Sequence, residues 1–242
     1  MIGADSAATF AAGETRTIEQ KTQKIDLIED RIIVASTGAV GMGQRFRAVV
    51  SKAWQEKVFA RHAPIEIGKL LSREAISDFG STGAPKGGFG ALVACYCREK
   101  PCLIEFGVTD FQPELKTSNI WYVSMGSGQM IADPFLGLMR KAFWDDGVPT
   151  CKDAEFVVTW ILSLAIELNP GGVNGPVQVA VLKPEKGDFK ATMLDPAQLD
   201  GHQGNVEGLV AHMRAYRDTL RGKGAEKALD VPKPEAAAEE KK

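Results

Sequence analysis

The sequence lacks the features that mark several large classes of protein. Aromatic residues make up 7% of its 242 residues, and it has only four cysteines. Its 29 basic and 31 acidic side chains leave a formal net charge of −2, so charge gives no indication of binding to nucleic acid or to an anionic membrane. The longest apolar stretch, residues 156–166, is shorter than the roughly 20 residues of a transmembrane helix. We therefore expect a globular protein that binds neither nucleic acid nor a membrane.

The cysteines indicate buried thiols rather than a metal centre. Cys95 and Cys97 could share one face of a strand with Cys102 on the next, which leaves a metal cluster open as an alternative. Zinc sites, however, usually place two residues between paired cysteines, and no histidine lies nearby in the sequence. No secretion signal is visible at the N-terminus, so we expect a cytoplasmic protein. No helix carries a cofactor motif, and we expect no cofactor and no metal.

The hydrophobic spacing predicts a mixed α+β protein. Groups of strands alternate with pairs of helices, and one helix ends the pattern. This order predicts a four-layer αββα sandwich of two antiparallel sheets flanked by helix pairs, formed by a single domain over residues 1–224. Residues 225–242 read as a disordered charged tail. The first nine residues are expected to form the end of a strand that runs into a turn extending to Gly13. The further expected strands are 21–28, 31–36, 91–97, 102–108, 119–125, 175–182 and 188–194, and the expected helices begin near residues 43, 64, 129, 156 and 204.

Four motifs occur in an order that is characteristic of a known family. They are IGADSAAT at 2–9, TQKIDLIEDRIIVASTGAVG at 22–41, YVSMGSGQMIA at 122–132 and NPGGVNGPVQVAVL at 169–182. With the helices expected between them, the chain resembles the proteasome beta-subunit family and bacterial proteasome-like proteins, which are N-terminal nucleophile hydrolases. The resemblance runs from Met1 to about Leu194. It implies the αββα fold, with the first strand of that fold apparently missing.

The resemblance also implies site residues. Asp5 matches the aspartate that orients a lysine, and Lys24 matches that lysine. Gly38 matches the glycine whose N–H supports the oxyanion, and Ser127 matches the serine near the nucleophile's amine. In the family, a processed N-terminal threonine attacks the scissile carbonyl with its own amine as base, and a nearby lysine cation keeps the pKa of that amine low. Taken singly, each residue also fits a plain strand, turn or bend.

The sequence departs from the family at the acidic support of the site. The family has Asp-x-x-Ser just before the Gly-Pro strand entry, and here those positions hold Asn169 and Gly172. A second placement puts Glu167 at the acidic position, but it requires a gap and leaves Pro170 opposite the serine. This departure favours an inactive subunit.

The family's threonine is also absent. It precedes the matching aspartate by about fifteen residues, one strand and one turn, whereas Asp5 is the fifth residue here. We therefore expect that the true product begins upstream of Met1, and the alternative is a subunit without chemistry.

The function expected from the resemblance is that of a peptidase subunit in a self-compartmentalising homo-oligomeric ring. It would hydrolyse peptide bonds of unfolded proteins by a threonine-type reaction, with an ATP-dependent unfoldase as a possible partner. A catalytically inactive structural subunit is the alternative, and hydrolysis of a small amide remains a third class.

Overall fold

The computed structural model describes residues 1–12, 15–84, 87–97, 100–144, 147–169, 172–185 and 188–222. The expected tail, 225–242, lies outside these residues. The chain divides into two units, Met1–Gln203 and Gly204–Lys242. Helix α6 (Pro196–Leu220) begins in the first unit and ends in the second. Every other helix and strand belongs to the first unit, which also contains the candidate site.

Five strands form one antiparallel sheet in the order β4-β5-β6-β7-β8. Along β5, the side chains alternate between two apolar clusters, as the two-residue period of a strand requires. Ile32 and Val34 join one cluster, and Ile33 and Ala35 join the other. The bounds of the strands are β4 Ile25–Ile28, β5 Ile32–Gly38, β6 Phe89–Cys97, β7 Lys100–Phe106 and β8 Pro113–Leu115.

Three strands form a second antiparallel sheet in the order β1-β9-β10, and a hairpin, β2-β3, stands apart from both sheets. Ile2 and Ala180 of the second sheet share a buried cluster with Ile25 and Ile33 of the first, so these two sheets contact each other. The bounds are β1 Ile2–Ala4, β9 Gln178–Glu185 and β10 Asp188–Met193, with β2 Ala7–Ala12 and β3 Thr15–Lys21 in the hairpin.

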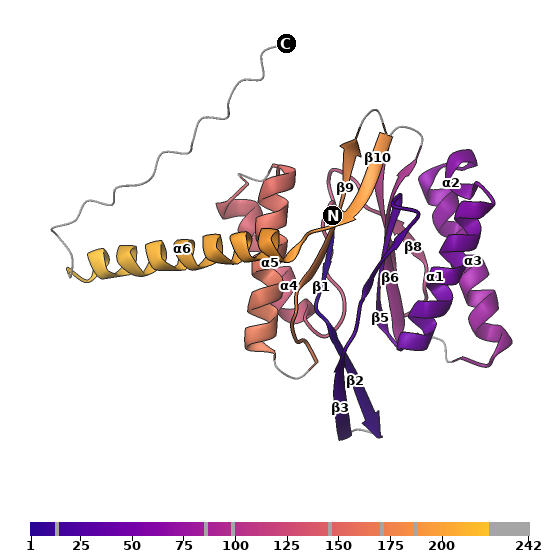
Figure 1. Ribbon diagram of the computed structural model, residues 1–242, viewed down its shortest axis with the longest axis horizontal. Coiled ribbons are helices and arrows are strands. Elements are labelled where there is room, and N and C mark those ends of the chain that lie inside the picture. The colour runs from indigo at the N-terminus through magenta and orange to yellow at the C-terminus, as the bar shows by residue number, and fades with distance from the viewer. Residues whose placement is uncertain are drawn as a thin grey trace, which may run out of the picture. The chain divides into compact units, whose positions relative to one another are not determined.

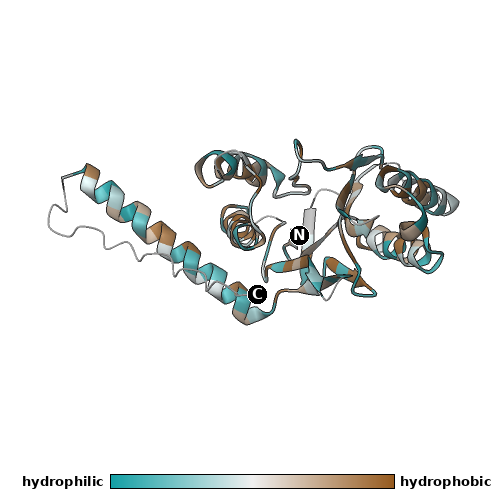
Figure 2. Ribbon diagram, turned by 90° about the horizontal axis from the view of Figure 1, so that it is seen from above, coloured by the Kyte–Doolittle hydropathy of each residue, from teal (hydrophilic) through white to brown (hydrophobic). Residues whose placement is uncertain are grey.

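Helices cover the outward faces of the sheets. Helices α1 (Val40–Gln55), α2 (Val58–Arg61) and α3 (Pro64–Ser81) lie on one side of the strands, and α4 (Gln129–Ala142) and α5 (Cys151–Leu168) lie on the other (Figures 1 and 2). Within the described residues the protein is thus a mixed α+β structure with antiparallel sheets and six helices.

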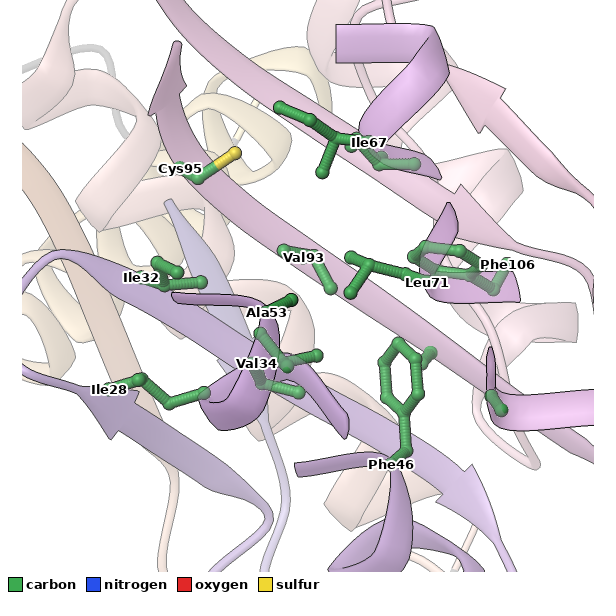
Figure 3. Close-up of a cluster of buried hydrophobic side chains, with 14 of the residues drawn as sticks. Ile28, Ile32, Val34, Phe46, Ala53, Ile67, Leu71, Val93, Cys95 and Phe106 are labelled. Atoms are coloured by element: carbon green, nitrogen blue, oxygen red, sulfur yellow. The ribbon is translucent and has the colours of Figure 1, made fainter. Parts of the chain in front are cut away.

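The largest apolar cluster lies between α1, α3 and the five-stranded sheet. Phe46 of α1 is fully buried there, and its ring meets those of Phe106 and Phe111 edge-on at centroid distances of 5.2 and 5.1 Å. Figure 3 shows Leu71 and Ile67 of α3 in the same cluster. Aromatic side chains are scarce in this chain, and three of the eleven phenylalanines, Phe89, Phe106 and Phe111, surround a fourth, Phe46, which concentrates apolar burial at this interface.

Most elements lie where the hydrophobic spacing predicts them, but two predictions are wrong. Residues 119–125 form turns and irregular backbone rather than a strand, and the neighbour of β7 is the short strand β8 instead. Trp121 and Tyr122 supply the strand-like composition of 119–125, but their rings pack against each other and toward the α4 and α5 cluster. The stretch expected to turn before Gly13 is strand β2.

None of the helices in the described residues combines the length and the apolar character needed to cross a membrane.

Candidate functional site

Asp5 and Lys24 form an ion pair at the end of the second sheet. Asp5 follows β1 and Lys24 precedes β4, and Lys24 Nζ lies 2.7 Å from Asp5 Oδ1. The other carboxylate oxygen, Asp5 Oδ2, accepts hydrogen bonds from the backbone N–H groups of Ala7 at 2.8 Å and Asn174 at 3.3 Å. The side chains are 15% and 23% exposed, so the pair is shielded but reachable from solvent. The geometry fixes the position of a positive charge at this site.

Gln178 connects the segments that carry this pair. Its Nε2 donates hydrogen bonds to Ser6 Oγ at 2.6 Å and to the carbonyl of Thr22 at 2.8 Å. Its Oε1 accepts from the backbone N–H of Lys24 at 3.1 Å. Gln178 could not be identified from the sequence, because nothing in its local pattern distinguishes it from any other polar residue of a strand.

Gly38 ends β5 in a conformation that requires glycine. Its φ is +100°, and a Cβ at this position would lie 2.1 Å from the carbonyl oxygen of Gly88. A side chain here would therefore clash with the backbone of Gly88 and Phe89, where β6 begins, as well as strain its own backbone. The bend that the sequence suggested is thus a tight contact between two strands.

Ser127 lies in the loop that leads into α4. Its Oγ donates to the carbonyl of Gly172 at 3.1 Å, and the side-chain amide of Asn169 donates to the Ser127 carbonyl at 2.9 Å. Gly126, with φ of +90°, lets this loop approach β5, since a Cβ there would lie 2.8 Å from Thr37 Oγ1. The close approach of Gly126 to Thr37 therefore brings the neighbour of Ser127 next to the neighbour of Gly38.

The segment from Gly172 to Pro176 links two of the predicted site residues, Ser127 and Asp5. Its first residue bonds Ser127, and Asn174 bonds Asp5 through its backbone N–H. The structure thus pairs Asp5 with Lys24 directly and connects Ser127 to Asp5 through this segment. Gly38 lies next to Thr37, which Gly126, the neighbour of Ser127, approaches closely. A cleft of about 400 Å³ opens beside the pair, lined by Ser6, Lys21, Thr22, Gln23, Pro176, Gln178 and Met193.

The arrangement places a lysine ammonium, paired with a carboxylate, at a fixed position. A lysine ammonium held by a carboxylate lowers the pKa of a nearby amine and stabilises negative charge that develops on a substrate. The groups in contact with Lys24 Nζ and with Ser127 that the structure describes are a carboxylate, a carbonyl and an amide.

A second polar cluster, which the sequence analysis did not identify, lies around Glu155 of α5. The carboxylate is 7% exposed and contacts Lys183 Nζ at 2.5 Å and His202 Nε2 at 3.5 Å. The hydrogen bond that Lys183 donates to Glu155 raises the pKa of Lys183, and burial raises the pKa of Cys151, whose Sγ lies 3.7 Å from the carboxylate. The cluster ties α5 to β9 and to the first turns of α6. Helix α5 holds other charged residues as well, so Glu155 has no distinguishing signal in the sequence.

Cys95, Cys97 and Cys102 form a cluster of thiols. The Sγ atoms of Cys95 and Cys97 lie 3.3 Å apart, and both residues are buried. The part of the chain that the structure describes contains no group of three side chains suited to hold a metal ion.

The chain was compared with protein-family models, with curated proteins and with solved structures. No family model matches the sequence, and no curated protein matches it. Among solved structures, the chain is similar to Anbu (ancestral beta-subunit) from Yersinia bercovieri, with a TM-score of 0.59 and 15% sequence identity. The match covers 88% of this chain and 91% of that chain. The likeness is one of fold.

The prediction that the chain belongs to the proteasome beta-subunit family is therefore wrong. Four short motifs in order supported it, but no model of a family matches the sequence and 15% identity carries the fold alone. The physical reason is that the arrangement of strands and helices depends on apolar spacing, which many sequences satisfy, whereas membership requires a match along the whole sequence.

Proposed function

We propose that this protein is a subunit of a proteasome-like ring assembly, in which Asp5, Lys24, Gly38 and Ser127 support threonine-type hydrolysis of peptide bonds. The observation that carries the proposal is the Asp5–Lys24 ion pair at 2.7 Å, in which the backbone N–H groups of Ala7 and Asn174 hold the Asp5 carboxylate, in a fold like that of an ancestral beta-subunit. The proposal includes the four-layer αββα sandwich as one domain over residues 1–224.

Each residue has a role in this proposal. Lys24, oriented by Asp5, lowers the pKa of the nucleophile's amine, so that the amine accepts the proton of the attacking hydroxyl. The backbone N–H of Gly38 supports the oxyanion, and Ser127 lies beside the amine. The reaction requires a terminal threonine as its nucleophile, and the labelling experiment below decides whether the mature molecule carries one. The substrates are unfolded proteins, supplied by an ATP-driven unfoldase.

Covalent labelling tests the chemistry. The assembled protein from its native cell is treated with a peptide electrophile that bonds both the hydroxyl and the amine of a terminal threonine, and the adduct is located by mass spectrometry. We expect one adduct per active chain, and we expect Lys24→Met to abolish it. Lys190→Met is the matched control, because Lys190 is an exposed lysine of β10 with a distant partner at 4.0 Å.

The same preparation tests assembly. Electron microscopy and light scattering should find a closed or open ring of identical subunits, and a monomer would contradict the proposal. A ring that neither cleaves denatured protein nor takes up the label would contradict the peptidase part alone.

A specific observation favours a second function, that of an inactive subunit in such an assembly. The groups next to Ser127 are the neutral amide of Asn169 and the backbone carbonyl of Gly172. A carboxylate at this place would help to orient a catalytic hydroxyl, and an amide is a weaker partner for that purpose. The labelling experiment separates the two functions.

A further inference from the structure

The side chain of Gln178 makes three hydrogen bonds, all to residues more than 150 positions away in the sequence. Its amide offers two donors and one acceptor that match what surrounds it, because Ser6 Oγ and the Thr22 carbonyl accept while the Lys24 N–H donates. Gln178 is the first residue of β9 and is half-buried, so a rigid strand holds the amide. The three bonds therefore converge on a fixed point.

These bonds lie on both sides of the lysine that the proposed function requires. Residues 22–24 connect β3 to β4 and belong to neither strand. Gln178 binds the carbonyl of Thr22 and the N–H of Lys24, so it fixes this connection at both ends. Gln178 also donates a hydrogen bond to Ser6, which is the residue next to Asp5. A single side chain thus sets the backbone positions from which both partners of the ion pair project.

We propose that Gln178 is a positioning residue that holds Lys24 against Asp5. It touches neither charged group, and it acts through the backbone that carries them. The inference rests on the proposed function for its catalytic meaning, since the pair matters for chemistry only if the site hydrolyses peptides. Whether Gln178 holds Lys24 against Asp5 can be tested even if the protein has no activity.

The test uses Gln178→Met, which keeps the length of the side chain and removes all three hydrogen bonds without adding charge. Trace acylation of the folded full-length protein, with each lysine quantified by mass spectrometry, reports how free each amine is. We expect Lys24 to react about fivefold faster in the variant, because the backbone that holds Lys24 against Asp5 is then less restrained. A factor of about five corresponds to the net loss of one hydrogen bond. Gln203→Met is the matched control, since it removes the bond from Ser163 Oγ and leaves the site unchanged.

An unchanged rate at Lys24 in a folded Gln178→Met protein would overturn the proposal. A purely structural effect would increase the rates of Lys116 and Lys183 as well, so these two lysines serve as internal references. Amide exchange of the wild-type protein gives a second measurement that does not depend on the variant's folding. The Lys24 amide should exchange at least about tenfold more slowly than that of Gln23, and equal rates would count against the proposal.

Peptide cleavage is measured on the same samples to separate the two proposals. Faster acylation of Lys24 in a protein that never cleaves peptides would leave Gln178 as a positioning residue and would contradict the peptidase function. If the wild type cleaves, Gln178→Met should lower kcat and shift the acidic limb of its pH profile, with little change in KM.

Discussion

At the scale of single residues, mutual hydrogen bonds and burial within the cysteine cluster on β6 and β7 raise the pKa values of Cys97 and Cys102. A hydrogen bond with Cys102 lowers the pKa of Cys97, but a hydrogen bond with Cys95 and burial outweigh it and raise the pKa to about 12. The pKa of Cys102 is also raised, chiefly by its hydrogen bond with Cys97. The thiols of Cys97 and Cys102 are therefore protonated and weakly nucleophilic near neutral pH, which is characteristic of packing rather than of catalysis.

This protonation predicts a loss of stability in alkali. In the unfolded chain a cysteine ionises near pH 9, whereas Cys97 in the folded protein ionises near 12. Between these values the folded state binds more protons, so its free energy of unfolding falls as pH rises, by about 1.4 kcal/mol per pH unit for one such thiol. Urea unfolding of wild type and Cys97→Ala at pH 8, 9, 10 and 11 measures this. The difference in stability between the two proteins should shrink above pH 9, and a constant difference would contradict the assignment.

At the scale of elements, α5 begins with a complete capping box. Thr150 Oγ1 accepts from the Asp153 N–H at 3.2 Å, and Asp153 Oδ2 accepts from the Thr150 N–H at 3.2 Å. The two side chains thus satisfy donors that the first turn of a helix leaves free. This cap fixes the start of the helix that also carries Glu155 and packs beside β1.

Loss of the cap should weaken the fold by a small, measurable amount. Thr150→Ala is expected to lower the free energy of unfolding by about 1 kcal/mol, because it removes the acceptor for the Asp153 N–H. Ser81→Ala, at the exposed end of α3, serves as a control and should change stability by less than about 0.5 kcal/mol. Equal effects of the two substitutions in urea titrations would show that the capping box adds no stability.

The elements differ in how far the sequence predicts them. Helix α5 was predictable because Val157, Ile161 and Ala165 recur at a helical spacing and are all buried. The strand expected at 119–125 was not, since Trp and Tyr favour strands only where a partner strand and a pleated surface are present, and here the rings pack near helices.

The site divides in the same way. Asp5 and Lys24 could be proposed from local motifs, and the structure brings them together. Gln178 and the Glu155 cluster depend on contacts across more than twenty residues of sequence, and no local pattern encodes such contacts.

At the scale of the whole molecule, the unit Met1–Gln203 is held together through β5. Ile32 and Val34 of this strand face the cluster under α1 and α3, while Ile33 and Ala35 face the cluster between the two sheets. That second cluster also contains Ile2 and Ala180 of the opposite sheet, which α5 covers. The two sides of the unit therefore share one strand, and a defect in it should be felt on both sides.

This sharing predicts a single unfolding transition for the unit. Ile33→Val removes one buried methyl group and should cost about 0.5 to 1.5 kcal/mol. Fluorine-labelled tryptophan gives a probe on each side, since Trp54 packs on the α1 cluster and Trp160 packs on the α4 and α5 cluster. Both signals should lose their folded resonances at the same urea concentration, and the substitution should move both midpoints down together. If the midpoint of Trp54 shifted while Trp160 kept its wild-type midpoint, the two sides would fold independently. The Asp5–Lys24 ion pair, whose partners adjoin β1 and β4 on the two sides, would then be lost as soon as the less stable side unfolds.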